Sequence, residues 1–326
     1  MATTHAVRFH ATGGPDVLRW EEVPLDPPGP GEALIRHTAI GLNFHDTYVR
    51  SGLYPVPELP AIPGVEGAGV VEAVGQGVVE VRVGERVAYA SAKLGAYAER
   101  RRIPAAQLVP LPEEISDELA AALMIKGMTA CYLLRRSHRV AKGEAILVHA
   151  AAGGVGLILC QWAKHLGAKV LGTVGSREKA ELAAAHGCDH PILYREEDFV
   201  ARAKALTRGE GVAVVYDSVG RDTFAGSLDC LKPLGTLVSF GQSSGKVPPF
   251  DILDLMAKGS LFLTRPSLFT HVAKREDLLG IAAETFAAAR AAFRVEIRQR
   301  YDLRKAAKAH RDIEARRTAG VSILRP

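Results

Sequence analysis

The sequence predicts an α/β fold in which a doubly wound parallel sheet is combined with a second, β-rich module. Two observations support this class. Between about residues 145 and 240, near-continuous apolar runs alternate with helical segments, as in parallel sheets whose two faces are both covered by helices. Before about residue 112, short β-branched runs are separated instead by glycine and proline.

The first module is predicted from three short apolar runs at residues 33–40, 69–74 and 85–90. Each run is rich in β-branched residues and is bounded by glycine or proline, which is typical of strands joined by tight turns. This part of the chain is therefore expected to be all-β or α+β.

The pattern changes at Ser116, which is followed by Asp117 and Glu118. A hydroxyl at the N-cap and acids in the first turn favour a helix start. A helix is predicted to run through residues 120–123, and a second helix is predicted to begin near Thr129.

Strands and helices then alternate strictly, which predicts a parallel sheet built from repeated βα units. The predicted strands are residues 145–150, 169–174, 211–217 and 236–240, and the predicted helices are residues 154–166, 176–186 and 221–231.

After about residue 265 a helical tail is predicted, over residues 275–292 and 303–317, and the chain ends in an edge-type strand at residues 321–324. A lone strand needs a sheet to join, and the first module is its simplest home. The parallel-sheet unit is then an insertion, with domain segments expected at 1–125, 126–264 and 265–326.

The 326 residues carry a formal net charge of +5, which invites a nucleic-acid interpretation. The densest basic clusters, residues 100–102 and 298–308, lack the interleaved aromatic residues of single-strand binders, so we interpret both as solvated faces. No apolar run approaches the roughly 18 residues of a membrane span. Residues 1–15 lack the apolar core of a signal peptide, so no membrane association and a cytoplasmic location are expected.

The four cysteines favour neither disulfides nor a metal site, because they are far apart and include no Cys-x-x-Cys pair. We expect small buried thiols at these positions, which are Cys131, Cys160, Cys188 and Cys230.

A glycine-rich loop follows the first strand of the alternating region and opens a helix, which is the context of a dinucleotide-binding turn. Ala151 stands at the first position of the G-x-G-x-x-G pattern, and the other two positions hold glycine. Bare backbone there lets a pyrophosphate approach the free N–H groups of the helix start. The predicted loop residues are Gly153, Gly154, Val155 and Gly156.

The end of the second strand indicates which dinucleotide is bound. An NAD site places an acid there to bind the ribose diol, whereas this chain has Gly175 and Ser176, followed by Arg177 and Lys179. A hydroxyl and two cations suit a 2′-phosphate, which favours NADPH. The alternative is that both cations are ordinary exposed helix residues and that Glu178 supplies the acid.

Residues 217–220 and 240–245 follow two further strands of the parallel sheet. Ligands bind at this edge of such sheets, although each segment is equally compatible with an ordinary βα turn.

With these motifs the chain resembles the quinone oxidoreductase/zeta-crystallin family of the medium-chain dehydrogenase/reductase superfamily. The resemblance runs along essentially the whole chain and is carried by residues 41–48, 50–55, 63–67, 143–164, 216–220 and 264–266.

The resemblance implies a GroES-like catalytic domain, a Rossmann domain, a homodimer, and NADPH held in a cleft between the domains. It assigns the phosphate and adenine end of NADPH to Gly154, Val155, Gly175, Ser176, Lys179 and Tyr194. It assigns the ribose and nicotinamide end to Asn43, Tyr48, Thr129, Tyr132, Ser218, Phe240, Gly241, Ser243 and Arg265. Without the resemblance, we would interpret Tyr194 as an aromatic residue at a strand end that packs on the next helix.

Zinc-dependent members of the superfamily have cysteine where this chain has Asn43 and histidine where it has Val65. Neither residue can replace a zinc ligand, so no metal is expected. A quinone suits such a site because it is already electrophilic, and the enzyme would act mainly by proximity and orientation. Alcohol dehydrogenase activity, which depends on a Lewis acid, is not expected.

We expect Asn43 and Tyr48 to hydrogen-bond the cofactor ribose or a quinone oxygen and Tyr54 to line the pocket, with no obligatory general acid. The structural alternative for Asn43 and Tyr48 is an Asx-type turn and a packed aromatic. Reduction of an activated C=C bond is a second enzymatic possibility. RNA binding or a structural role, as in zeta-crystallin relatives, is a third, although no RNA-recognition module is visible.

Overall fold

The computed structural model describes residues 2–56 and 58–326, which form two compact units. Unit 1 comprises residues up to Met128 together with His271–Phe286 and Val295–Pro326, and unit 2 comprises Thr129–Thr270 and Ala287–Arg294. The domain boundaries expected from the sequence are 125/126 and 264/265, and the corresponding boundaries between the two units are 128/129 and 270/271. The return of the chain to unit 2 over Ala287–Arg294 was not expected.

Unit 2 contains a six-stranded, wholly parallel sheet in the order β10-β9-β8-β11-β12-β13, which confirms the doubly wound prediction. The order reverses between β8 and β11, so the ligand edge of such a sheet lies at the carboxyl ends of these strands. The strands are β8 (Ala145–Val148), β9 (Lys169–Val174), β10 (His190–Leu193), β11 (Val212–Asp217), β12 (Leu231–Ser239) and β13 (Phe262–Thr264).

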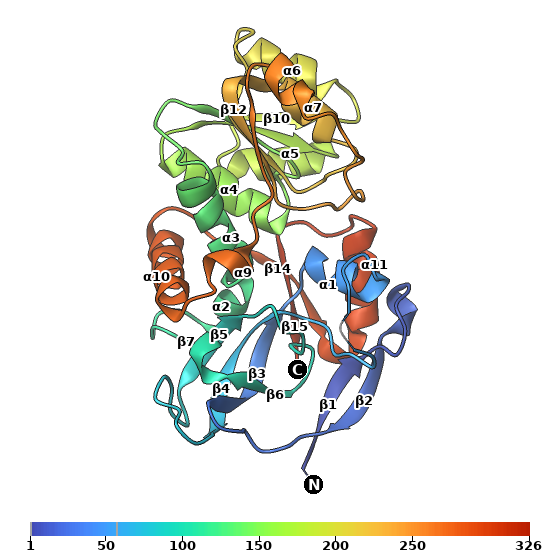
Figure 1. Cartoon of the computed structure of the whole chain (residues 1–326), viewed down its shortest axis with the longest axis vertical. Coiled ribbons are helices and arrows are strands. Elements are labelled where there is room, and N and C mark those ends of the chain that lie inside the picture. The colour runs from blue at the N-terminus through green and yellow to red at the C-terminus, as the bar shows by residue number, and fades with distance from the viewer. Residues whose placement is uncertain (1, 57) are drawn as a thin grey trace. The chain divides into compact units, whose positions relative to one another are not determined.

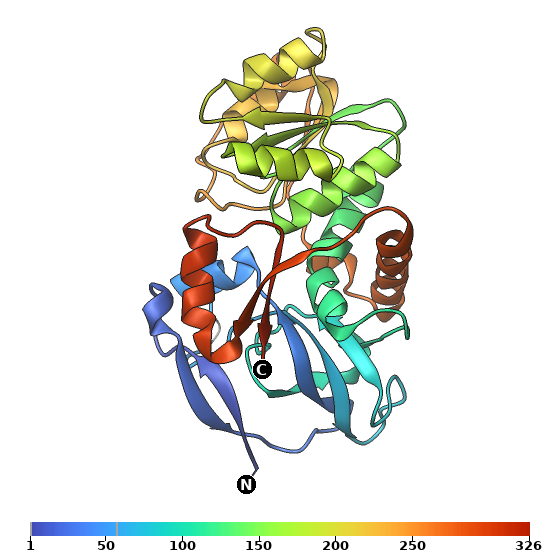
Figure 2. The ribbon, with the colours of Figure 1, turned by 180° about the vertical axis from the view of Figure 1, so that it is seen from behind.

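Helices cover both faces of this sheet, with α4 and α5 on one face and α6 and α7 on the other (Figures 1 and 2). Every residue of β11 is buried as a result. The helices are α4 (Gly154–His165), α5 (Arg177–Ala185), α6 (Phe199–Leu206) and α7 (Phe224–Asp229).

The structure corrects several predicted elements of unit 2. Strand β8 ends at Val148 rather than 150, because Ala150 adopts a left-handed φ of 52° that an extended strand cannot contain. The sequence interpretation missed β10, α6 and β13, which are short: β10 has four residues and β13 has three. Helix α7 begins at Phe224 because the preceding turn folds around Asp217.

Unit 1 contains a seven-stranded sheet in the order β14-β15-β3-β4-β5-β7, with β6 also paired to β3, and a separate antiparallel pair of β1 with β2. Its strands are β1 (Thr3–Arg8), β2 (Arg19–Pro24), β3 (Glu32–Gly41), β4 (Glu66–Val74), β5 (Arg86–Ala90), β6 (Arg100–Pro104), β7 (Val109–Pro110), β14 (Ile297–Asp302) and β15 (Val321–Arg325).

The C-terminal strand β15 joins the sheet of the first module as predicted, but it is not an edge strand. It pairs with β3 on one side and with β14 on the other. The sequence interpretation missed β14, where half-buried residues alternate with exposed charged ones and no apolar run exists.

The remaining helices include α2, whose predicted N-cap is confirmed because the Ser116 hydroxyl accepts a hydrogen bond from Leu119 N. Helix α3 starts before Thr129, at Lys126. The helices are α1 (Phe44–Ser51), α2 (Asp117–Leu123), α3 (Lys126–Tyr132), which continues as a π-helical turn over Leu133–Ser137, α8 (Leu253–Ala257), α9 (Leu268–His271), α10 (Arg275–Ala291) and α11 (Ala306–Glu314).

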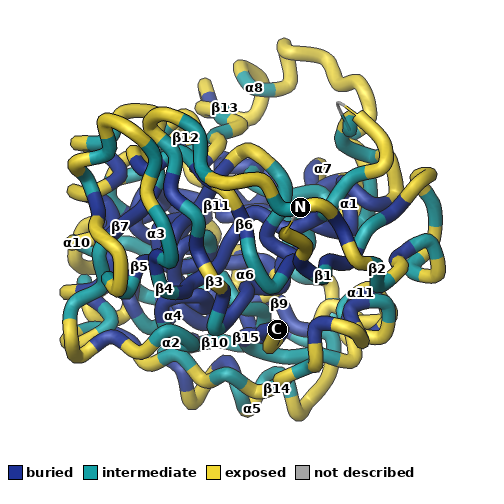
Figure 3. Tube along the Cα trace, turned by 90° about the horizontal axis from the view of Figure 1, so that it is seen from below, coloured by how far each residue is buried: buried dark blue, intermediate teal, exposed yellow. Residues whose placement is uncertain are grey.

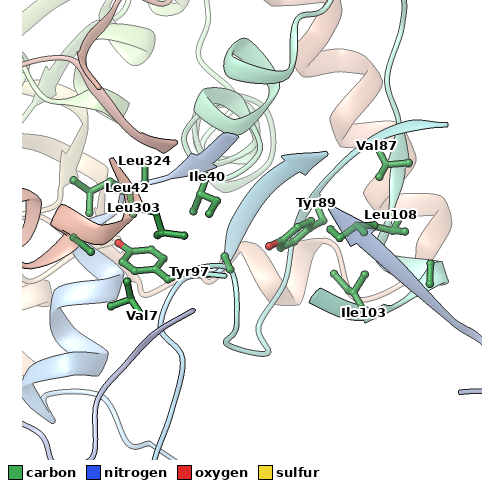
Figure 4. Packing of buried hydrophobic residues seen from close by; sticks show 14 of the residues in the cluster. Val7, Ile40, Leu42, Val87, Tyr89, Tyr97, Ile103, Leu108, Leu303 and Leu324 are labelled. Atoms are coloured by element: carbon green, nitrogen blue, oxygen red, sulfur yellow. The ribbon is translucent and has the colours of Figure 1, made fainter. Parts of the chain in front are cut away.

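The core of unit 1 is built from the inner faces of its sheet and from α11, with Tyr89 and Tyr97 packed among aliphatic side chains (Figure 4). The central strands of both sheets are largely buried, whereas residues 248–254 are exposed (Figure 3). No helix in the described part of the chain is long and apolar enough to cross a membrane.

The basic cluster at 100–102 is only partly a solvated face, which corrects the sequence interpretation. Arg101 is buried, lies over the Tyr89 ring and donates to the carbonyls of Lys93 and Leu94. In the second cluster, Arg300 pairs with Glu118, so much of this positive charge is locally neutralised.

Candidate functional site

The predicted dinucleotide loop lies between β8 and α4, and its backbone is packed too closely for side chains at two of its glycines. A Cβ atom on Gly156 would lie 2.3 Å from the carbonyl oxygen of Ala150, and one on Gly153 would lie 3.1 Å from the same atom. Gly153 is the N-cap of α4, and the first backbone hydrogen bond of the helix is Leu157 N to Gly153 O at 2.9 Å. The amides of residues 154–156 therefore lack an acceptor within the helix, as at any helix start that can bind an anion.

Ala151, which replaces the first glycine of the pattern, is accommodated by a glycine on the neighbouring strand. A Cβ on Gly172 of β9 would lie 2.6 Å from the Ala151 Cβ and 2.7 Å from Cys188 Sγ. Ala151 N also donates to Thr173 O at 3.0 Å. The missing methyl group at 172 makes the room that the methyl group at 151 occupies.

A buried polar network lies beneath this loop and links three strand ends. His149, at the end of β8, contacts Thr173 Oγ1 at 2.9 Å and Ser227 Oγ at 3.0 Å. Ser227 in turn donates to Asp217 Oδ2 at 3.2 Å, and Thr223 also donates to this fully buried carboxylate. Burial lowers the pKa of His149, which favours the neutral ring.

The end of β9 brings together the residues predicted for the adenine side of the cofactor. The Tyr194 hydroxyl lies over Gly175, since a Cβ on that glycine would be 2.8 Å from it. Ser176 caps α5, with its hydroxyl accepting from Lys179 N at 3.3 Å. Arg177 is exposed and lies 3.3 Å from Glu196. The site therefore presents a hydroxyl, a half-buried lysine and an aromatic ring.

The turns after β11 and β12 are hydrogen-bonded to each other. Ser243 N donates to Ser218 O at 3.2 Å, and Phe240 N donates to Asp217 O at 2.8 Å. Gly241 is required here, because a Cβ would lie 2.5 Å from the Ser218 carbonyl oxygen. The two segments that were individually ambiguous thus form one rigid edge.

Arg265, which follows β13, is attached to the same edge. Its guanidinium donates to Ser239 O at 3.0 Å and to Gly241 O at 2.7 Å. Arg265 also interacts electrostatically with Tyr132. Burial raises the pKa of Tyr132, and the Arg265 charge and a hydrogen bond with Thr129 oppose this rise. These residues therefore share one end of the sheet with the loop at 240–245.

In unit 1, Asn43 belongs to a buried charged cluster. Its amide nitrogen donates to Glu66 Oε2 at 2.8 Å, and Lys126 Nζ lies 3.1 Å from the same oxygen. Glu66 is fully buried, and its other oxygen accepts from Ile125 N at 2.6 Å. Burial raises the pKa of Glu66, and Lys126 opposes this shift most strongly. A Cβ on Gly41 would lie 2.0 Å from Glu66 Oε2, so only glycine admits the carboxylate.

Tyr48 and Tyr54 belong to an aromatic cluster at α1. Their rings are 5.2 Å apart in an edge-on arrangement, and Tyr48 also lies 6.1 Å from Phe44. His45 meets the other side of Tyr54 at 5.5 Å. Both structural alternatives are thus present, since Asn43 caps α1 and Tyr48 is packed, and neither excludes a contact with a ligand.

Asn43 and Val65 occupy the positions of the zinc ligands, and neither side chain is a zinc ligand. Val65 is fully buried, and Asn43 is tied to Glu66. Among residues 2–56 and 58–326, no group of three or more His, Cys, Asp or Glu side chains is arranged to hold a metal ion.

Comparison with known proteins identifies the family. Residues 29–113 match the alcohol dehydrogenase GroES-like domain, and residues 154–276 match the zinc-binding dehydrogenase family. Quinone oxidoreductase from Pseudomonas aeruginosa is 51% identical over 98% of this chain and 99% of its own length. The chain belongs to the quinone oxidoreductase family. This membership confirms the resemblance found in the sequence, including its GroES-like and Rossmann-type parts.

Two further members of the family are informative. The crystal structure of Escherichia coli quinone oxidoreductase complexed with NADPH matches with a TM-score of 0.97 and 48% identity, over the full length of both chains. A 2-haloacrylate reductase from a Burkholderia species is 45% identical over 98% of each chain. Similar chains in this family thus carry names that refer to two kinds of acceptor.

The structure gathers the predicted site residues into two groups. The residues from 153 to 265 lie in segments that follow strands of the unit 2 sheet, and Thr129 and Tyr132 lie in α3. Asn43, Tyr48 and Tyr54 lie at α1 of unit 1. The sequence interpretation missed the buried partners, namely Glu66, Lys126, His149 and Asp217. A charged or polar residue within an otherwise apolar run was the only available signal, as at Glu66 beside Val65 and at His149 after β8.

Proposed function

We propose that this protein is an NADPH-dependent quinone oxidoreductase that operates without zinc. The observation that carries the proposal is the loop at Gly156, where bare backbone and free helix amides meet. Membership of the quinone oxidoreductase family at about half identity supports the same activity.

The cofactor site of unit 2 fits NADPH better than NADH. The amides of Gly154 and Val155 would bind the pyrophosphate, and Ser176 and Lys179 would bind the 2′-phosphate, with Tyr194 beside the adenine. Bound NADPH supplies a hydride. Arg265 holds the carbonyl of Gly241 in place and so fixes the backbone that would orient the nicotinamide end.

Unit 1 would provide the acceptor contacts. Asn43 has its amide nitrogen committed to Glu66, so its amide oxygen is the atom that would accept a hydrogen bond from a ribose hydroxyl. The Tyr48 hydroxyl would donate to a quinone oxygen, and Tyr54 would line the pocket. Unchanged kinetics of Tyr48→Phe with NADPH and 1,4-benzoquinone would remove this hydroxyl from the reaction.

Reduction of an activated C=C bond is a second candidate, favoured by the 2-haloacrylate reductase among the relatives. Hydride addition to such a substrate leaves an enolate that needs a hydrogen-bond donor, a role that Tyr48 can also serve. Steady-state rates with benzoquinones, 2-alkenals, 2-haloacrylates and enoyl thioesters would separate the two. The proposal expects quinones to give the highest kcat/KM.

A homodimer is proposed from the resemblance and from one apolar surface. Ile252 and Met256 of α8 and Phe262 of β13 are exposed by 74%, 66% and 60%, and β13 is the last strand of its sheet. An exposed apolar face beside an open strand edge suits pairing with a second copy. Light scattering should give a dimer mass, and Phe262→Asp should lower it. A cytoplasmic location remains a proposal consistent with four buried free thiols.

The direct test of the activity is NADPH oxidation at 340 nm with a panel of quinones. The proposal predicts quinone-dependent turnover with NADPH and much weaker turnover with NADH. Turnover that requires added zinc, or none with any quinone, would contradict it.

A further inference from the structure

One titratable pair near the aromatic cluster of α1 has no role in the function proposed above. His45 is partly exposed, with 27% of its side chain accessible, and the neighbouring Asp46 is fully buried. Nδ1 of His45 lies 3.9 Å from Oδ1 of Asp46, within ion-pair distance but beyond hydrogen-bond length. The two residues are consecutive in α1, two and three positions after Asn43.

The two oxygens of Asp46 have different surroundings. Oδ2 accepts hydrogen bonds from Asn43 N at 2.9 Å and from the Tyr97 hydroxyl at 3.0 Å. Oδ1 is buried without a hydrogen-bond partner within the described residues. A buried carboxylate oxygen left unsatisfied is costly, so an approach of about 1 Å by the His45 ring would be favourable.

A directed chain of hydrogen bonds stabilises this carboxylate. Arg50 can only donate, so its contact of 3.5 Å with His310 makes Nδ1 of that ring the acceptor. Nε2 of His310 then donates to the Tyr97 oxygen at 3.0 Å, and the Tyr97 hydroxyl is left to donate to Asp46. Glu314 neutralises Arg50 at the surface end. Each hydrogen bond that links Arg50, His310, Tyr97 and Asp46 is donated toward Asp46.

His45 is therefore placed between a fixed carboxylate and the proposed acceptor contacts. Because Nδ1 faces Asp46, Nε2 is the nitrogen on the far side of the ring. The same ring packs against Tyr54, which in turn contacts Tyr48. The titratable and charged groups around the pair include Tyr54 and Tyr48 beside His45, and Tyr97, Tyr89, His310, Arg50 and Glu314 near Asp46.

We propose that His45, held by Asp46, donates the proton that completes reduction of the acceptor. A quinone that gains a hydride from NADPH becomes a hydroquinone monoanion. The Nε2–H bond of protonated His45 breaks, its proton forms the new O–H bond, and the neutral ring regains a proton from water. Asp46 is a positioning residue that stabilises the protonated ring. This inference rests on the proposed quinone reductase activity.

The test compares His45→Phe, which keeps an aromatic ring against Tyr54, with Asp46→Asn. The acceptor is duroquinone, whose alkyl groups make hydride acceptance more dependent on an acid. We expect wild-type kcat to fall as pH rises, because a neutral ring cannot donate the proton. We expect His45→Phe to lower kcat at pH 6 by roughly 10- to 100-fold, with the pH dependence lost. Asp46→Asn should move the fall in kcat to lower pH.

His138→Phe is the matched control, because His138 also lies beside a carboxylate, 3.2 Å from Glu144, with 19% of its side chain exposed. It should leave the pH profile unchanged. The affinity for NADPH, measured by fluorescence, should be the same in all variants. The NMR resonances of the His45 ring report the pair without turnover, and Asp46→Asn should move them.

An unchanged pH profile and kcat in His45→Phe would overturn the inference while leaving quinone reduction intact. An unmoved pH profile of kcat in Asp46→Asn would also overturn it. Failure of the wild type to oxidise NADPH with any quinone would instead refute the proposed function, so the two failures are distinguishable.

Discussion

Replacement of Lys126 by methionine should strongly destabilise the protein, because it leaves Glu66 as a buried carboxylate without its cation. The ammonium lies 3.1 Å from Glu66 Oε2, the carboxylate is fully buried, and Lys126 itself is 5% exposed. Breaking such a pair costs about 3–5 kcal/mol, because the hydrogen bonds from Ile125 and Asn43 cannot supply the missing charge. At about 2–4 °C per kcal/mol, the melting temperature should fall by roughly 10 °C.

The pH dependence of this loss follows from the sign of the Glu66 shift. Burial raises the pKa of Glu66, and removal of Lys126 would raise it further. The folded variant then binds more protons than the unfolded chain, so its unfolding free energy should decrease as pH rises above the unfolded pKa of glutamate. Lys126→Met should therefore be more destabilised at pH 8 than at pH 5, and the added substitution Glu66→Gln should abolish that difference.

Urea unfolding followed by circular dichroism at pH 5, 7 and 8 measures both effects. Lys258→Met is a suitable control, since Lys258 pairs with Asp229 at the surface, where ion pairs contribute about 0–1 kcal/mol. A loss below about 1 kcal/mol for Lys126→Met, or no dependence on pH, would refute the account of this cluster.

Three further predictions follow from the described contacts. Gly156→Ala should weaken NADPH binding at least about 10-fold and cost about 1–3 kcal/mol of stability, measured by calorimetry and melting, because its Cβ would lie 2.3 Å from the Ala150 oxygen. Lys179→Ala should weaken binding of NADPH about 10- to 100-fold while leaving NADH binding nearly unchanged. Burial lowers the pKa of His310 to about 4, so the unfolded chain binds more protons between about pH 4 and 6.5. His310 should therefore contribute a fall of about 3 kcal/mol in unfolding free energy as pH is lowered through this window, and His310→Gln should reduce the slope by that contribution.

The sequence predicted the parallel sheet well because strands buried on both faces must be apolar throughout. Strand β11 illustrates this, since all of its residues are buried. Strand β14 was missed for the opposite reason, because it pairs with only one neighbour and carries charged side chains between half-buried ones. Its existence depends on pairing with β15, which local sequence does not encode.

The site was predictable where it depends on local backbone and unpredictable where it depends on long-range contacts. The glycines at 153 and 156 and the missing acid after β9 are visible in a few consecutive residues. Compensation of Ala151 by Gly172 is not, since it joins neighbouring strands. The attachment of Asn43 to Glu66 likewise depends on the pairing of β3 with β4, so the sequence predicted the residue but not its partner.

Every functional proposal for this protein depends on NADPH binding by the bend at residues 150–156 and the side chains after β9. Fluorescence titration of the purified protein with NADPH and NADH, side by side, measures this binding. We expect saturable binding of NADPH at least about 10-fold tighter than that of NADH, with the preference lost in Lys179→Ala. Equal affinity for the two dinucleotides, or no binding of either, would contradict it.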